Sequence, residues 1–182
     1  MFFHRNRRRR GFGLAEVLIV GAIVAGAHSE GNYTYAINEA NRVKGVHNLK
    51  QIYTILQIES MTDRLPSPAF YPKGDPKTDP TSIVRIMKDV PPEMFISPFA
   101  PEALKKTGLT FVWNDTVNGK QLDQLPKGTW LMIDIAAFIT DPNVPKPTSY
   151  LVLYANGDAM AVDTLPPDIV KAVQEAQEKG KK

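Results

Sequence analysis

The chain has 182 residues, enough for one domain and an extension, and its 22 basic and 19 acidic residues give a formal net charge of +3. It contains no cysteine, which excludes disulfide bonds, thiol catalysis and cysteine metal sites. The basic excess does not indicate nucleic-acid binding, because residues 1–11 hold five arginines and no acid. Without that segment 17 basic residues stand against 19 acidic ones, a formal charge of −2. We therefore expect no nucleic-acid partner.

The N-terminal segment, residues 5–27, joins a basic cluster to an apolar run. The cluster includes Arg7, Arg8, Arg9 and Arg10, and the run over 12–27 holds one ionisable side chain, Glu16. Arginines beside an apolar stretch orient a segment in a membrane with the charged end cytoplasmic, and we assign that role to these four. A charge at bilayer depth costs about 2.5–3.5 kcal/mol on insertion scales, so we expect Glu16 to have a partner.

Gly11, Phe12 and Glu16, placed after a basic leader, resemble the prepilin-type signal of type IV pilins and type II secretion pseudopilins. The resemblance implies that a prepilin peptidase cleaves between Gly11 and Phe12 and that Phe12 is then N-methylated. It also implies that Phe12 and Glu16 direct subunit assembly, with the Glu16 carboxylate paired to the Phe12 ammonium of a neighbouring subunit. Two buried charges are tolerable together and costly alone, so this pairing would supply the partner that Glu16 requires.

The same resemblance implies a location and a set of partners. It implies a single-pass protein of the bacterial inner membrane with a periplasmic C-terminal domain, which later enters a pilus or pseudopilus fibre. The implied partners are the lipid bilayer, the peptidase, an inner-membrane assembly platform, and copies of itself or other pilins. We expect no cofactor and no enzymatic activity, because His4, His28 and His47 lack a second ligand or a nucleophile nearby in sequence and no phosphate loop or nucleophile elbow is found.

Two further segments resemble pilin-like proteins of planctomycete- and verrucomicrobia-type bacteria. Residues 38–59 resemble their helix continuation, which often reads N-R-A-K-C-x-N-N-L-K-Q-I, and residues 150–162 (YLVLYANGDAMAV) resemble their closing hairpin. The matching helix positions are Asn41, Arg42, Lys44, Asn48, Leu49, Lys50, Gln51 and Ile52. The chain departs from that pattern at Gly45, where many relatives have Cys, and at residues 156–158, where Asn-Gly-Asp replaces Asp-Gly-His.

One long helix is predicted from residue 12 to about residue 63. Its first half is apolar on all faces, and its second half has apolar residues at spacings of three and four, namely Ile37, Ala40, Val43, Leu49, Ile52, Tyr53 and Leu56. We expect the stripe over 49–56 to pack against the protein's own sheet. Gly21, Gly26 and Gly31 lower helix propensity by about 1 kcal/mol each. They permit close helix approach in a membrane or local unwinding in a fibre, and a break near Gly31 stays open.

The remaining residues predict a head built around a small sheet. Residues 65–101 are rich in proline, with one short helix over 81–88. Strands are predicted at 109–114, 129–136, 150–155 and 159–162, because β-branched and aromatic residues are frequent there. Asn156 and Gly157 predict a two-residue hairpin turn, because both residues tolerate positive φ. A last helix is predicted over 168–178.

The predicted fold class is therefore α+β and pilin-like: a long N-terminal helix with a transmembrane first half, packed on a small antiparallel sheet, and a short C-terminal helix. The predicted parts are a basic leader (1–11), a transmembrane and assembly segment (12–30), an amphipathic helix continuation (31–64) and a globular head (65–182).

Acidic residues near the late strands were the candidates for a metal site. Some pseudopilins bind calcium through carboxylates of C-terminal loops, and Asp134, Asp141, Asp158 and Asp163 lie near predicted strands and turns. Their spacing matches no calcium loop, so we expect solvated turn acids and no metal.

A Sec signal peptide is the alternative interpretation of the N-terminus. Residues 25–27 (Ala-Gly-Ala) fit an A-x-A cleavage site after a short apolar core. Cleavage there would release a soluble periplasmic binding or interaction protein that begins at His28. Glu16 inside the apolar core argues against this alternative. A twin-arginine leader fits Arg9-Arg10-Gly11-Phe12 only loosely.

Overall fold

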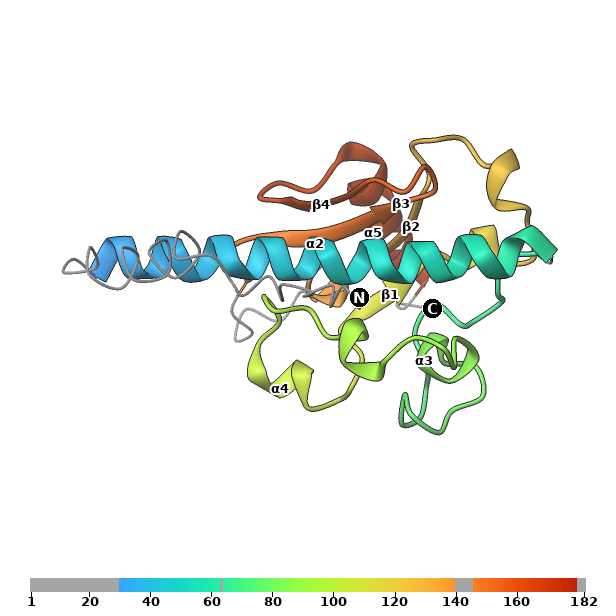
Figure 1. Cartoon of the computed structure of the whole chain (residues 1–182), viewed down its shortest axis with the longest axis horizontal. Helices are drawn as coiled ribbons and strands as arrows, with labels where there is room; N and C mark the ends of the chain where they lie inside the picture. The colour runs from blue at the N-terminus through green and yellow to red at the C-terminus, as the bar shows by residue number, and fades with distance from the viewer. Residues whose placement is uncertain (1–29, 63, 140–145, 180–182) are drawn as a thin grey trace, which may run out of the picture. The chain divides into compact units, whose positions relative to one another are not determined.

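The computed structural model describes residues 30–62, 64–139 and 146–179 (Figure 1). The predicted leader, cleavage and methylation site, Glu16, and Asp141 lie outside the described residues. The chain divides into two compact units, 1–39 and 40–182. None of the helices in the described ranges combines the length and the apolar character needed to cross a membrane.

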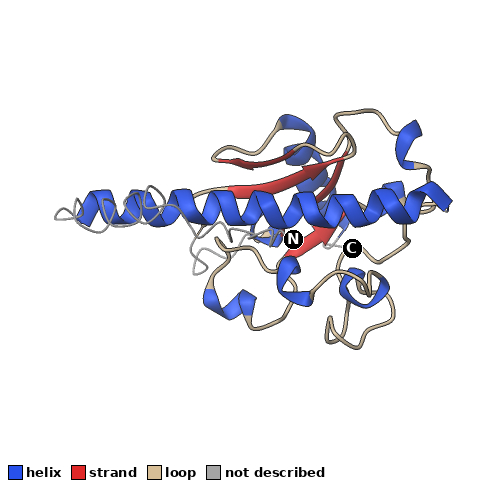
Figure 2. Cartoon of the chain, viewed as in Figure 1, coloured by secondary structure: helices blue, strands red, loops and turns tan. Residues whose placement is uncertain are grey.

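Helix α2 (Glu30–Thr62) is the longest element of the described chain (Figure 2). It confirms the described part of the predicted long helix. Gly31 and Asn32 lie inside α2, so the helix has no break at that point. The unit boundary at 39/40 places most of α2 in the same compact unit as the sheet, whereas the predicted boundary at 64/65 separated the helix from the head.

Four antiparallel strands form one sheet in the order β1-β2-β3-β4. They are β1 (Phe111–Trp113), β2 (Trp130–Asp134), β3 (Tyr150–Tyr154) and β4 (Ala159–Val162). All four predicted strands are confirmed, the first three with slightly shorter bounds. The α+β class and the pairing of neighbouring strands follow from the alternation of short β-rich segments with turns.

Both faces of the sheet are covered. Leu49, Ile52 and Leu56 of α2 belong to one core cluster with Phe111, Trp113, Leu131, Met132, Leu151 and Leu153. Helix α5 (Pro167–Lys179) contributes Ile169 and Val173 to a second cluster with Val112, Trp130, Ile133 and Val152. Successive residues of β1 and β3 therefore alternate between the two clusters, as the period of a strand requires.

Strand β2 departs from this alternation at one point. The β2–β3 register shifts between Trp130 and Met132. Leu131 and Met132, although consecutive, both belong to the α2-side cluster, while Trp130 and Ile133 belong to the α5-side cluster. An extra residue of this kind is the signature of a β-bulge.

The proline-rich segment contributes to the core as well as to the surface. It contains α3 (Ile83–Ile86), which confirms the predicted short helix, and the 3-10 helix η1 (Pro92–Phe95), and it is followed by α4 (Glu102–Lys105). Buried side chains from it enter the α2-side cluster, namely Ile83, Val84, Met87, Val90 and Phe95. Short 3-10 helices η2 (Asp115–Val117), η3 (Leu122–Gln124) and η4 (Ile135–Phe138) complete the connections.

The β3–β4 hairpin is present, but its predicted turn type is wrong. The amide of Tyr154 donates to the Asp158 carbonyl over 2.8 Å, and the amide of Gly157 donates to the Tyr154 carbonyl over 3.0 Å. Gly157 has φ +85°, and no described non-glycine residue has positive φ, so Asn156 does not. The loop is thus a three-residue one closed by a left-handed glycine. The Asn156 side chain accepts from the amide of Asp158, an Asx-type bond that favours ordinary turn geometry.

Candidate assembly surface

Helix α2 carries apolar side chains on two opposite faces. Leu49, Ile52 and Leu56 are fully buried, whereas Ile58 and Met61 are 62% and 82% exposed. At about 100° per residue, Ile58 and Met61 lie on the side of the helix away from the buried three. We call the exposed side, with Val43, Ile58 and Met61, the outer face.

The predicted packing of the stripe over 49–56 is confirmed at Leu49, Ile52 and Leu56, whereas the apolar residues before it lie elsewhere on the helix. Ile37, Ala40 and Val43 are exposed and do not continue the stripe of Leu49. Six residues separate Val43 from Leu49, a rotation of about 240°, so the two positions cannot share one face. This change of helical phase between Val43 and Leu49 is visible in the sequence, and it is the signal that identifies the outer face.

The buried face of α2 approaches β3 closely at Gly45. A Cβ at this position would lie 2.3 Å from Cδ1 of Leu151, a side chain that is itself fully buried. Glycine therefore permits the close packing of α2 on β3. Glycine at this position has this packing reason, which the sequence alone did not reveal.

Tyr53 holds the β3–β4 hairpin against α2. Its hydroxyl donates to the carbonyl of Ala155 over 2.9 Å, and burial raises the pKa of that hydroxyl. A Cβ at Gly157 would lie 2.6 Å from Cε1 of Tyr53. Gly157 is thus required twice, by its positive φ and by the ring that packs on it.

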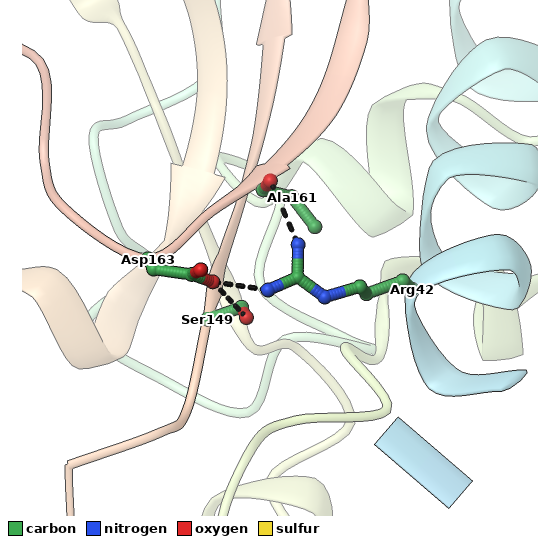
Figure 3. A network of polar contacts seen from close by, with 4 residues as sticks. All are labelled: Arg42, Ser149, Ala161 and Asp163. Atoms are coloured by element: carbon green, nitrogen blue, oxygen red, sulfur yellow. Dashed lines mark hydrogen bonds and ion pairs between the residues drawn. The ribbon is translucent and has the colours of Figure 1, made fainter. Parts of the chain in front are cut away.

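Arg42 connects α2 to the other end of the same hairpin (Figure 3). Its guanidinium donates to the carbonyl of Ala161 over 3.3 Å and forms an ion pair with Asp163. Asp163 also accepts from the Ser149 hydroxyl over 2.7 Å. The Ser149 hydrogen bond, followed by the bond from Arg42, lowers the pKa of Asp163. Because both side chains reach solvent, the ion pair positions the hairpin and contributes little stability.

The structure does not bring the predicted acidic residues into a metal site. In the described ranges no group of three or more His, Cys, Asp or Glu side chains is placed to hold a metal ion. The prediction of solvated turn acids is wrong for Asp134, which is buried, whereas Asp163 is exposed to solvent as well as paired with Arg42. Asp158 is exposed and accepts from the Asn156 side-chain amide.

Asp134 is the buried acid of the sheet. Its Oδ2 accepts from the amide of Leu151 over 2.5 Å, and its Oδ1 accepts no hydrogen bond of regular geometry. Burial raises the pKa of Asp134 to about 7, against smaller lowering contributions from the Leu151 amide and the nearby Ser97 hydroxyl. Its contacts are to the Leu151 amide of the sheet and to the Ser97 hydroxyl, so we interpret it as a structural acid with a proton-dependent charge.

The outer face of α2 is apolar at both ends and polar between them. Val43 precedes Lys44, His47 and Lys50, and Ile58 and Met61 follow. His47 and Gln51 share a hydrogen bond of 2.9 Å between His47 Nε2 and Gln51 Nε2. Such a face can pack against another helix, with apolar contacts at each end and polar side chains in the middle.

Comparisons with known proteins identify no relative of this chain. No family model, no curated protein and no solved structure matches the chain.

Proposed function

We propose that the protein is a structural subunit of a type IV pilus-like or type II secretion pseudopilus-like fibre. In this proposal a prepilin peptidase cleaves after Gly11, Phe12 is methylated, and the subunit waits in the inner membrane before it assembles through its N-terminal helix. The arginines 7–10 keep the leader cytoplasmic until cleavage, and the Phe12–Glu16 pair sets the register of each incoming subunit.

The observation that carries the proposal is the outer face of α2. The helix already buries one apolar face on its own sheet, yet Val43, Ile58 and Met61 remain exposed on the other. Burial of apolar surface contributes about 25 cal/mol per Å², so association of neighbouring helices along this face is favourable. An α+β head in which a long helix precedes a small antiparallel sheet also supports a pilin-like fold.

Disulfide cross-linking tests the packing of this face. The chain has no cysteine, so a single introduced cysteine gives a clean background. We expect Ile58→Cys to form dimers on oxidation in membranes or sheared fibres, because copies of α2 would lie side by side. The matched control is Lys127→Cys, an exposed position outside α2, which should stay monomeric. Equal cross-linking at both positions, or none at Ile58→Cys, would contradict assembly through the outer face.

The N-terminal residue of the mature protein tests the processing. Sequencing of the membrane fraction should find N-methylated Phe12, and Gly11→Val should leave the precursor mass unchanged. Glu16→Ala should be processed and membrane-bound yet absent from fibres. A soluble product that begins at His28 would instead support the Sec-exported binding protein.

A further inference from the structure

A lysine-lined pocket is formed mainly by the proline-rich segment and shares no lining residue with the outer face of α2. It has a volume of about 440 Å³. Two short segments contribute to its lining: residues 71–77, which follow α2 in the chain, and residues 106–107, which follow α4. The residues relevant here are Tyr71, Lys73, Asp75, Lys77, Lys106 and Thr107. We call it the lysine pocket.

The segment that carries Lys73 and Lys77 is held by local hydrogen bonds. Asp75 Oδ1 accepts from the amide of Lys77, and Asp79 Oδ2 accepts from the amide of Gly74, both over 2.9 Å. These side-chain-to-backbone bonds restrict the loop before any ligand arrives. A restricted loop loses less conformational entropy on binding than a mobile one.

Lys77 spans the two segments of the pocket. A Cβ on Gly108 would lie 3.2 Å from Cε of Lys77, so the aliphatic part of the lysine packs on the glycine backbone. Gly108 has φ +82° and follows Thr107 directly. The packing keeps the Lys77 side chain next to the segment that carries Lys106.

The pocket has an excess of positive charge. Within the described chain, Lys73, Lys77 and Lys106 form no ion pair, whereas the adjacent Lys105 pairs with Glu102 over 2.8 Å. Asp75 is the one acid among the lining residues, and its Oδ1 is engaged by the amide of Lys77. Among the lining residues three ammonium groups against one carboxylate leave a formal charge of +2. When Lys105, Asp79 and Glu102 are added, four lysines stand against three acids, and the remaining +1 favours an anionic ligand.

The hydroxyls of Tyr71 and Thr107 further restrict which ligands fit the pocket. Tyr71 donates its proton to the carbonyl of Leu109 over 3.0 Å, and the Thr107 hydroxyl lies within hydrogen-bond distance of the carbonyls of Leu104 and Leu109. Because their protons are engaged by backbone carbonyls, both oxygens can serve a ligand mainly as acceptors. The pocket therefore suits a ligand that carries both oxyanions and hydroxyl donors.

We propose that the lysine pocket binds an acidic polysaccharide. Its carboxylate groups interact with the three lysines, and its ring hydroxyls donate to Tyr71 and Thr107. DNA offers oxyanions without hydroxyl donors along its backbone. Its bases bind through exposed aromatic side chains, but Tyr71, the one aromatic residue of the lining, is half-buried with its hydroxyl engaged. The proposal concerns the head alone and holds whether or not the protein forms fibres.

Binding of defined oligosaccharides to the purified full-length chain tests the proposal. The probes are a galacturonate hexamer, a neutral galactose oligomer of equal length and single-stranded DNA of equal charge. We expect the galacturonate hexamer to bind, the neutral oligomer to bind at least about tenfold more weakly, and the affinity to fall as salt shortens the screening length below about 10 Å.

Charge-matched variants locate the site. The triple variant Lys73→Gln, Lys77→Gln, Lys106→Gln should weaken binding of the hexamer at least about tenfold. The control Lys88→Gln, Lys120→Gln, Lys127→Gln removes the same charge from exposed positions outside the pocket and should bind as the parent does. All six side chains are exposed, so circular dichroism should show both variants folded. Unchanged binding in the first variant, or an equal loss of binding in both variants, would show that the lysine pocket is not the binding site. Tighter binding of DNA through the same lysines would overturn the assignment to a polysaccharide.

Discussion

The two faces of α2 have similar residue types and opposite surroundings. Ile52 is fully buried in the core between helix and sheet, while Ile58, less than two turns later, is 62% exposed. Composition does not distinguish them; helical phase does, because six residues are about 600° of rotation and so place the two side chains on different sides. The comparison shows that one helix buries apolar residues in the head on one side and exposes residues of the same type on the other, and we propose the exposed side as a contact surface.

Truncation of matched isoleucines gives the largest expected contrast. Ile52→Ala should lower the free energy of unfolding by about 2–5 kcal/mol, because it leaves a cavity in the core. Ile58→Ala should change it by less than about 0.5 kcal/mol and should reduce assembly instead. Urea unfolding of the two full-length variants measures the first effect and sedimentation of fibres the second. Similar losses of stability in both variants would contradict the assignment of faces.

A change of pH should affect the stability of the buried core through Asp134. Its folded-state pKa of about 7 lies above its ordinary value of 3.8, so its contribution to stability is fully present below about pH 4 and is lost as pH rises through 7. The difference is on the order of 2–4 kcal/mol. Asp134→Asn should remove this dependence and raise the urea midpoint at pH 8.

The control for the acid is Asp123→Asn, which changes an exposed carboxylate and should keep the pH dependence of the parent. Burial and, to a smaller extent, the charge of Asp134 raise the pKa of Tyr150, so the ionisation of this tyrosine lies above the pH range of the experiment. A parent protein whose urea midpoint stays constant between pH 4 and pH 8 would show that Asp134 is not a buried acid.

Restoring a side chain at Gly45 tests how closely the buried face packs. Gly45→Ala should lower stability by about 1–3 kcal/mol, since its Cβ would press into Leu151. The double variant Gly45→Ala, Leu151→Ala should recover part of that loss relative to Leu151→Ala alone. A helix that gains stability from Gly45→Ala, as propensity alone predicts, would contradict the close approach.

The smallest effect is expected at the surface pair of Arg42 and Asp163. Arg42→Gln removes the ion pair but keeps much of the side chain, so Tm should fall by less than about 4 °C. The loss should shrink further at high salt, because both groups reach solvent. A decrease as large as that of Ile52→Ala would mean that the pair is not the surface contact described above.

The sequence predicted the elements better than it predicted their surroundings. The strands and α5 were found because β-branched, aromatic and amphipathic patterns are local properties of the chain. The burial of Asp134 was missed, because it depends on β3 and the segment around Ser97, both distant in sequence. The turn at Asn156 was given the wrong type, because a side-chain bond to Asp158 outweighs the usual preference of an Asn-Gly pair.

The same limits apply to the candidate sites. Helical phase separates Val43 from the stripe of Leu49 and could have been read from the sequence alone. The lysine pocket could not, because Lys73 and Lys106 meet only through the fold of the proline-rich segment. The cleavage and assembly residues Gly11, Phe12 and Glu16 lie outside the described residues and stay predictions.

The bulge in β2 has a consequence for the alignment of the strands. A one-residue slip of β2 would carry Trp130 or Ile133, depending on its direction, from the α5-side cluster into a position of the α2-side cluster. The extra residue therefore fixes the register of β2 against β3.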